Sequence, residues 1–125
     1  MHEIGHNIRF HHSNEGSTTY ADQSGMMRYS YSSNESPVMC FNAAKSWEFN
    51  RYDNNKEAFN VATNAAELYT IKGIATVNSH NSAQKALIKI NSSSSTVYYM
   101  NFNRQTGVNS GTREGYNQGK SLLDV

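Results

Sequence analysis

The sequence predicts an α+β fold, and three observations lead to this prediction. Residues 1–10 have the composition of a helix and carry polar ligand-type side chains at positions i and i+4. Residues 41–52 show helical spacing, with Phe41, Ala44 and Trp47 expected on one side. Beyond Asp53 the apolar residues alternate as they do in strands. We therefore expect two short helices followed by a β-rich C-terminal half.

The chain has 125 residues, which fits one domain or part of one. We expect residues 1–55 and 56–125 to be two parts of the same domain. Hydrophobic residues make up 37% and charged residues 17%, whereas there are 16 Asn and 16 Ser. This composition favours long loops around a modest core and is typical of extracellular proteins.

Within this frame the individual segments can be assigned. Residues 13–39 lack a sustained period, so we expect an irregular loop there. The tail from residue 104 to residue 120 has four glycines and predicts turns. The segment Ser92–Ser95 is a plausible hairpin connection. Extended segments are expected at Ala66–Asn78, Gln84–Asn91 and Thr96–Asn103.

Charge and hydropathy exclude several classes of function. The formal net charge is +1, and no basic stripe forms the footprint of a nucleic-acid-binding protein. No run approaches the roughly 18 apolar residues that indicate a membrane span. Cys40 is the single cysteine, so no disulfide can form within the chain.

The motif that carries chemistry lies in the first twelve residues. His2, Glu3 and His6 form the pattern H-E-x-x-H, which places two imidazoles on one face of a helix with a glutamate beside them. A catalytic zinc needs three protein ligands and one open position. His12 offers the third ligand if the chain leaves the helix and doubles back. His11 is the alternative, and its spacing favours a solvent-facing role.

Four segments carry a family resemblance. The stretch HEIGHNIRFHHS resembles the zinc-binding sequence of metzincins, and in particular that of the gametolysin family of secreted peptidases. YADQSGMMRYSY is similar to the methionine-turn segment of that family, and VMCFNAAKSW to the helix that follows. FNRQTGVNSGT is similar to a late segment of algal and diatom members. The four segments begin at His2, Tyr20, Val38 and Phe102 respectively.

The resemblance implies a zincin-type active-site helix and a methionine-turn loop. It implies that His2, His6 and His12 bind zinc and that Glu3 is the general base. Met27, rather than Met26, would form the hydrophobic floor under the metal, and Tyr29 would reach the metal site as a further catalytic residue.

The resemblance also implies a location and a substrate. The family is secreted, and Asn34 and Asn91 begin glycosylation sequons that we expect in loops. The implied substrate is an extracellular or cell-wall protein or glycoprotein, and we expect a monomer. Family members carry an N-terminal sheet, and we expect that sheet to be missing from this sequence. We therefore expect Met1 to be an internal methionine of a longer protein or the start of a truncated gene model.

Departures from the family pattern keep an alternative open. The family has glycines where this chain has Arg9 and Arg28. Glycine suits the first position because the helix must end there, and left-handed backbone costs other residues about 1–2 kcal/mol. The alternative to a peptidase is a truncated, inactive remnant that serves as a β-rich interaction fragment. A glycan-binding module is a third hypothesis, but Tyr98 and Tyr99, on which it depends, are more typical of packing residues.

Overall fold

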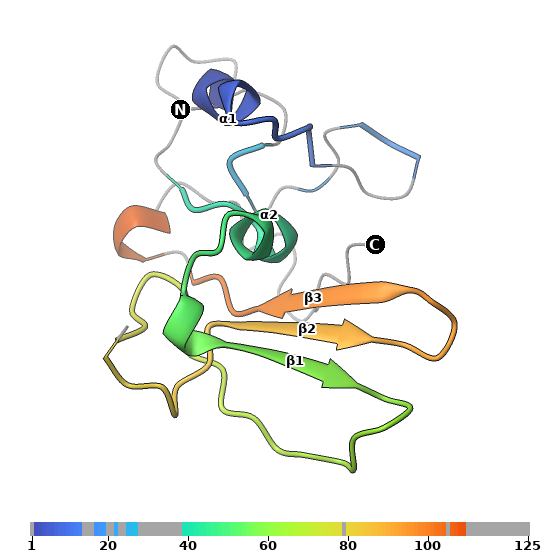
Figure 1. Cartoon of the computed structure of the whole chain (residues 1–125). Coiled ribbons are helices and arrows are strands. Elements are labelled where there is room, and N and C mark those ends of the chain that lie inside the picture. Colours follow the sequence, from blue (N-terminus) through green and yellow to red (C-terminus); the bar gives the residue numbers. More distant parts are fainter. Residues whose placement is uncertain are drawn as a thin grey trace.

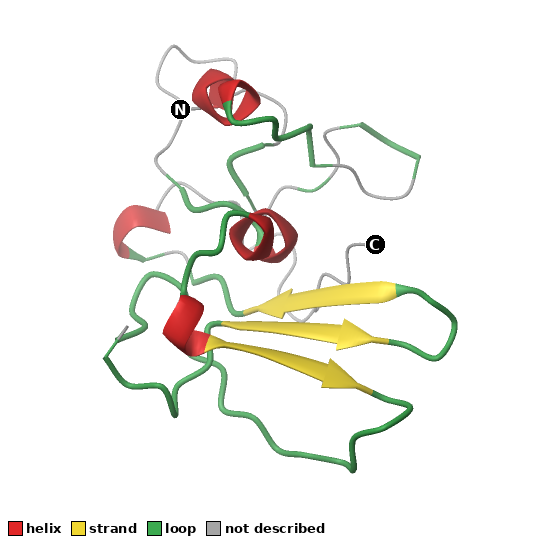
Figure 2. Ribbon diagram, in the orientation of Figure 1, coloured by secondary structure: helices red, strands yellow, loops and turns green. Residues whose placement is uncertain are grey.

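The computed structural model describes residues 2–13, 17–19, 22, 25–27, 39–78, 80–104 and 106–109. In these residues the chain forms a small α+β arrangement in which loops connect few regular elements (Figure 2). Those elements are α1 (His2–Asn7), α2 (Ala43–Glu48), the 3-10 helix η1 (Asp53–Asn55), the strands β1 (Lys56–Asn60), β2 (Leu87–Asn91) and β3 (Val97–Asn101), and the 3-10 helix η2 (Gly107–Asn109).

The strands form one mixed sheet in the order β1-β2-β3. β1 pairs in parallel with β2, from Lys56 opposite Leu87 to Asn60 opposite Asn91. β2 and β3 are antiparallel, and the chain between them closes with a hydrogen bond from the Ser92 amide to the Thr96 carbonyl. The predicted hairpin across Ser92–Ser95 is therefore confirmed.

Helix α2 lies on one face of this sheet, and α1 lies beyond α2 (Figure 1). The core between α2 and the sheet contains Ala43, Ile74, Ala86 and Leu87. Trp47 and Tyr99, among other partly buried side chains, pack against it. The sheet and α2 thus form a platform beneath the first helix.

Helix α2 is shorter than the predicted span of residues 41–52. It begins after Asn42, whose side chain accepts a hydrogen bond from the Lys45 amide as an N-cap. It ends at Glu48, because Asn50 takes a left-handed conformation with φ of 56°. Its buried residues are Ala43 and Ser46 rather than the predicted face.

The strand predictions were partly wrong. Residues 66–78 form no strand and contribute only the isolated bridges Ile71–Lys85 and Gly73–Phe102. Residues 61–68 are all exposed, so that loop lacks the buried face that would stabilise a strand. Strand β1 was not predicted, because its polar sequence KEAFN has little alternation. The extended segments predicted at residues 84–91 and 96–103 contain β2 and β3, and Asn91, which begins a sequon, is the last residue of β2.

No helix in the described part of the chain is both long enough and apolar enough to cross a membrane.

Candidate metal centre

The candidate site is built on α1 and on the way this helix ends. The Arg9 amide donates to the His6 carbonyl at 2.9 Å, and the Phe10 amide donates to the Gly5 carbonyl at 3.0 Å. This pair of bonds defines a Schellman motif, in which the residue after the cap adopts a left-handed backbone. Arg9 takes that position with φ of 68°, where the sequence analysis expected a site suited to glycine. The chain reverses here and returns residues 11–13 towards the helix.

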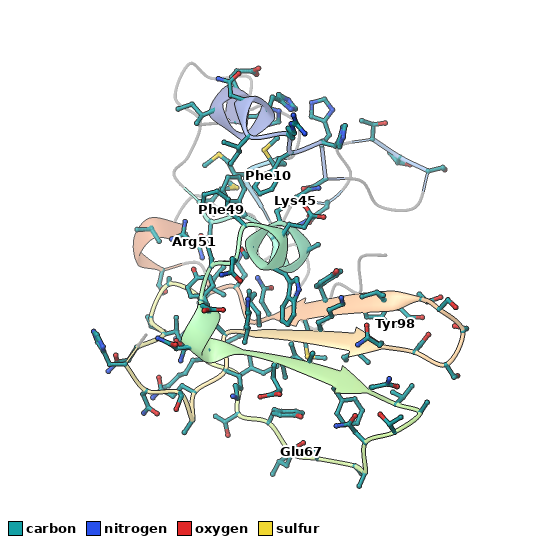
Figure 3. The ribbon with its side chains drawn as sticks, in the orientation of Figure 1. Phe10, Lys45, Phe49, Arg51, Glu67 and Tyr98 are labelled. Atoms are coloured by element: carbon teal, nitrogen blue, oxygen red, sulfur yellow. The ribbon has the colours of Figure 1, made fainter. Side chains whose placement is uncertain are left out.

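Phe10 fixes this reversal onto the rest of the molecule. It is buried, and its ring contacts Phe41 and Phe49 edge-to-face at centroid distances of 5.0 and 6.0 Å. The Lys45 ammonium lies 5.5 Å from the centre of the same ring. Figure 3 shows Phe10, Phe49 and Lys45 in the space between α1 and α2. The turn that carries His12 is therefore anchored to α2 by an aromatic cluster.

Because the chain reverses, His12 meets the two histidines of the helix. Potential ligand nitrogens of His2, His6 and His12 all lie within 4.8 Å of one another. The ring centroids are separated by 4.9 Å for His2 and His6, 4.6 Å for His6 and His12, and 5.4 Å for His2 and His12. All three side chains are half-buried. His11 and His80 are exposed.

Backbone carbonyls orient two of the three rings. His2 Nδ1 lies 2.9 Å from the Met26 carbonyl oxygen, and His6 Nδ1 lies 2.8 Å from the Phe10 carbonyl oxygen. A carbonyl oxygen can only accept, so in each hydrogen bond Nδ1 carries the proton. In the neutral ring this leaves Nε2 with its lone pair available to a metal. A carbonyl partner on the other ring nitrogen is the usual arrangement for histidines that bind metals.

Electrostatics at the site favour a neutral third imidazole. Burial lowers the pKa of His12, and the nearby His6 and His2 lower it further. The charge of Glu3 opposes this effect, which places its carboxylate within electrostatic reach of His12. Glu3 itself is exposed on α1. The site thus combines three imidazoles with one solvent-accessible carboxylate.

Met27 lies directly beneath this helix face. Its side chain is fully buried, and it packs so closely on Gly5 that a Cβ added at Gly5 would overlap Met27 Sδ. Gly5 sits between His2 and His6, so the thioether supports the backbone that carries both. Met26 is also buried, and its carbonyl accepts the hydrogen bond from His2 Nδ1.

The donor set fits zinc. Structural and catalytic zinc sites use imidazole nitrogens at about 2.0–2.1 Å, and three such ligands with an open position are typical of catalytic zinc. Two nitrogens bound tetrahedrally to one ion lie about 3.4 Å apart. The present separations therefore require only side-chain adjustments on the order of 1 Å to close around an ion.

Some of the predicted residues cannot be placed, and two contacts at the site were not predicted. Tyr29, Arg28 and Asn34 lie outside the described residues. Sequence reasoning missed the orienting carbonyls of Met26 and Phe10. No residue-type signal could have found them, because every residue has a carbonyl.

Comparisons of the chain with models of protein families, with curated proteins and with solved structures gave no match.

Proposed function

We propose that this chain is a zinc-dependent metalloendopeptidase whose ligands are His2, His6 and His12. The observation that carries the proposal is the convergence of these three imidazoles, two of them held by carbonyls in the tautomer that a metal requires. Two histidines on one helix would support the proposal less, since histidines at positions i and i+4 are also found on helix surfaces.

Each residue has a distinct role in this proposal. Bound zinc supplies Lewis-acid polarisation of the scissile carbonyl and activation of a water molecule. Glu3 takes a proton from the attacking water and passes it to the leaving amine. Its exposure suits this role because both water and substrate must reach the carboxylate. His2, His6 and His12 hold the ion and leave a position open for the reaction.

Met27 would serve as the hydrophobic floor of the site. Its burial beneath Gly5 supports this role, since a rigid apolar layer fixes the helix that carries two ligands. We further propose, from the family resemblance, that the substrate is an extracellular or cell-wall protein or glycoprotein. Secretion, a monomeric state and a contribution from Tyr29 are proposals on the same basis.

The first test is metal content. The chain should bind one zinc ion, and His2→Ala, His6→Ala or His12→Ala should each abolish stoichiometric binding by isothermal titration. His11→Ala is the matched control, because His11 is adjacent in sequence but exposed. If His11→Ala loses zinc and His12→Ala retains it, the ligand assignment is wrong.

The second test separates binding from catalysis. Glu3→Gln should keep zinc affinity within about threefold and lower peptide hydrolysis by about 10²–10⁴-fold, the usual contribution of a general base. Hydrolysis of a quenched fluorescent peptide library by the zinc-loaded protein measures this. If the zinc-loaded parent shows no hydrolysis that depends on Glu3, the peptidase proposal fails, and the inactive remnant that retains a zinc site takes its place.

A further inference from the structure

A buried polar cluster lies behind the candidate metal centre, on the side facing α2. It consists of Ser13, Asp22 and Asn42, each at most 6% exposed. Asn42 Nδ2 donates to Asp22 Oδ2 at 2.7 Å and contacts Ser13 Oγ at 3.3 Å. A carboxylate that is buried to this degree needs hydrogen-bond donors, because an unsatisfied one costs several kcal/mol. The Asn42 amide is one such donor.

The cluster joins three segments that are distant in sequence. Ser13 directly follows His12, and its amide donates to the Met27 carbonyl at 2.7 Å. The backbone of residue 25 lies against that of residue 42, since a Cβ added at Gly25 would come 2.5 Å from Asn42 N. Asn42 therefore contacts both the segment after the third histidine and the 25–27 turn.

The same turn orients the first histidine. The Met26 carbonyl accepts the His2 ring hydrogen bond, and the Met26 amide donates to the Cys40 carbonyl at 3.1 Å. The segment that ends in Asn42 thus sets the position of the turn, and the turn sets the angle of the His2 ring. Asn42 is thus connected to His12 through Ser13, and to His2 through the 25–27 turn.

We propose that Asn42 is a positioning residue of the metal centre, which holds the His12 segment and the 25–27 turn in the geometry that binds the ion. This inference rests on the proposed zinc site. Asn42 touches neither histidine directly, and it also caps α2 through Oδ1. Its positioning role depends on the opposite end of the same amide, the Nδ2 donor.

Asn42→Asp separates these two roles. Aspartate is as good an N-cap as asparagine, so the bond to the Lys45 amide is kept. The Nδ2 donor is lost, and a second carboxylate is placed against Asp22. Changing a partner that is hydrogen-bonded directly to a metal ligand typically lowers metal affinity by about 10–100-fold, and Asn42 lies one segment further away, so we expect a loss of about tenfold. The double variant Asn42→Asp, Asp22→Asn exchanges donor and acceptor at unchanged net charge, and it should recover at least part of that loss.

The experiment uses Co²⁺ as the probe, because its visible absorption reports ligand geometry as well as binding. Titration should show a dissociation constant about tenfold higher in Asn42→Asp and an altered absorption band. Ala44→Gly is the matched control, since it weakens α2 by about 1 kcal/mol without touching the cluster. It should leave the Co²⁺ spectrum unchanged.

The outcomes are distinguishable. If the parent chain binds no Co²⁺ or Zn²⁺, the proposed zinc site itself fails. If the parent binds and Asn42→Asp loses no more affinity than Ala44→Gly, only the positioning role is overturned. It is also overturned if the exchanged double variant recovers nothing. Should Asn42→Asp fail to fold, Ser13→Ala removes one acceptor and should weaken Co²⁺ binding about fivefold. Unchanged binding in that variant counts against the proposal.

Discussion

Two regions of this molecule are stabilised in different ways. The histidine region comprises residues 2–13, 22 and 25–27, and the sheet region comprises residues 43–78 and 80–103, which contain α2, the three strands and the loops around them. In the sheet region, paired strands and the Ala86–Leu87 core support one another. In the histidine region the six-residue helix α1 exposes Ile4, the turn after it exposes Ile8, and the helix depends on loop contacts.

The difference follows from the length of the elements. A helix shorter than about 12–15 residues is marginal by itself, so α1 owes its order to tertiary contacts. Those contacts are the buried Phe10 and Met27 and the hydrogen bonds of the 25–27 turn. A bound ion would add further constraints in the same place. We infer that the sheet region determines whether the chain folds, and that the histidine region is where a metal would change stability.

The largest expected effect tests the sheet region. Leu87 is 1% exposed at the centre of the core, so Leu87→Ala should lower the free energy of unfolding by about 2–5 kcal/mol. Met27→Ala is the matched variant in the histidine region, where the side chain is equally buried. Denaturant unfolding combined with hydrogen exchange should show that Met27→Ala spares the strand amides. If both variants lower strand protection equally, the two regions are one cooperative unit and the comparison fails.

Zinc should stabilise the two regions unequally. At a free concentration of 100 times the dissociation constant, a ligand that binds only the folded state stabilises it by about 2.7 kcal/mol. Hydrogen exchange should slow most at the amides of Arg9, Phe10 and Ser13, which close the loop between the second and third histidines. The amides of Ala86 and Ser92 in the sheet region should change less. Addition of a chelator should reverse the effect, and uniform slowing would argue against a local site.

The meeting of the three histidines follows from local rules that a sequence reveals. Positions four apart share a helix face, and the spacing to His12 requires a reversal near Arg9. The structure has that reversal, with left-handed backbone at Arg9. Zinc binding and the role of Glu3 stay predictions. The contacts of Asn42 with Ser13 and Asp22 could not be predicted, because they depend on which distant segments meet.

The fold shows the same division between local and distant information. The β2–β3 hairpin was predictable because alternation and a short polar connection are local signals. The parallel pairing of β1 with β2 joins residues about thirty positions apart and leaves little trace in the sequence KEAFN. Asn55 illustrates the point: its buried side chain donates to the carbonyls of Asn81 and Gln84 and fixes the loop before β2. No local pattern in the sequence predicts this role.

A smaller effect concerns the alkaline stability of the sheet region. Burial raises the pKa of the Tyr52 hydroxyl to about 12, with a further contribution from Cys40. The unfolded chain would release this proton near pH 10, so stability should be fully present below pH 10 and fall as the pH rises towards 12. Tyr52→Phe should flatten that decline in unfolding experiments at several pH values.

Tyr69 provides the control for this measurement. Its pKa is also raised to about 12, mainly by the hydrogen bond to Glu67. Tyr69 and Glu67 both lie on an exposed loop, where salt screens the interaction between the hydroxyl and the carboxylate. Salt should therefore lower the pKa of Tyr69 and leave that of Tyr52 unchanged, as tyrosinate absorbance in the two Tyr→Phe variants can show. An equal response to salt would mean that Tyr52 is not protected by burial.

The smallest expected effect compares how the two helices end. Arg9 and Asn50 occupy equivalent positions in Schellman motifs, with φ of 68° and 56°, after α1 and α2 respectively. A left-handed backbone costs most residues about 1–2 kcal/mol, whereas asparagine adopts it more readily. Glycine removes this cost but loses about 0.5–1 kcal/mol through the greater freedom of the unfolded chain.

Arg9→Gly should therefore stabilise the reversal before His12 by up to about 1 kcal/mol and tighten zinc binding by at most about fivefold. Asn50→Gly should gain nothing, and it also loses the contact between Asn50 Oδ1 and the Lys56 ammonium. Zinc titration and thermal unfolding of the two variants provide the measurement. If Asn50→Gly stabilises the protein and Arg9→Gly has no effect, backbone strain is not concentrated in the histidine region. The expected order instead places the strained turn at the loop that would close around the proposed zinc ion.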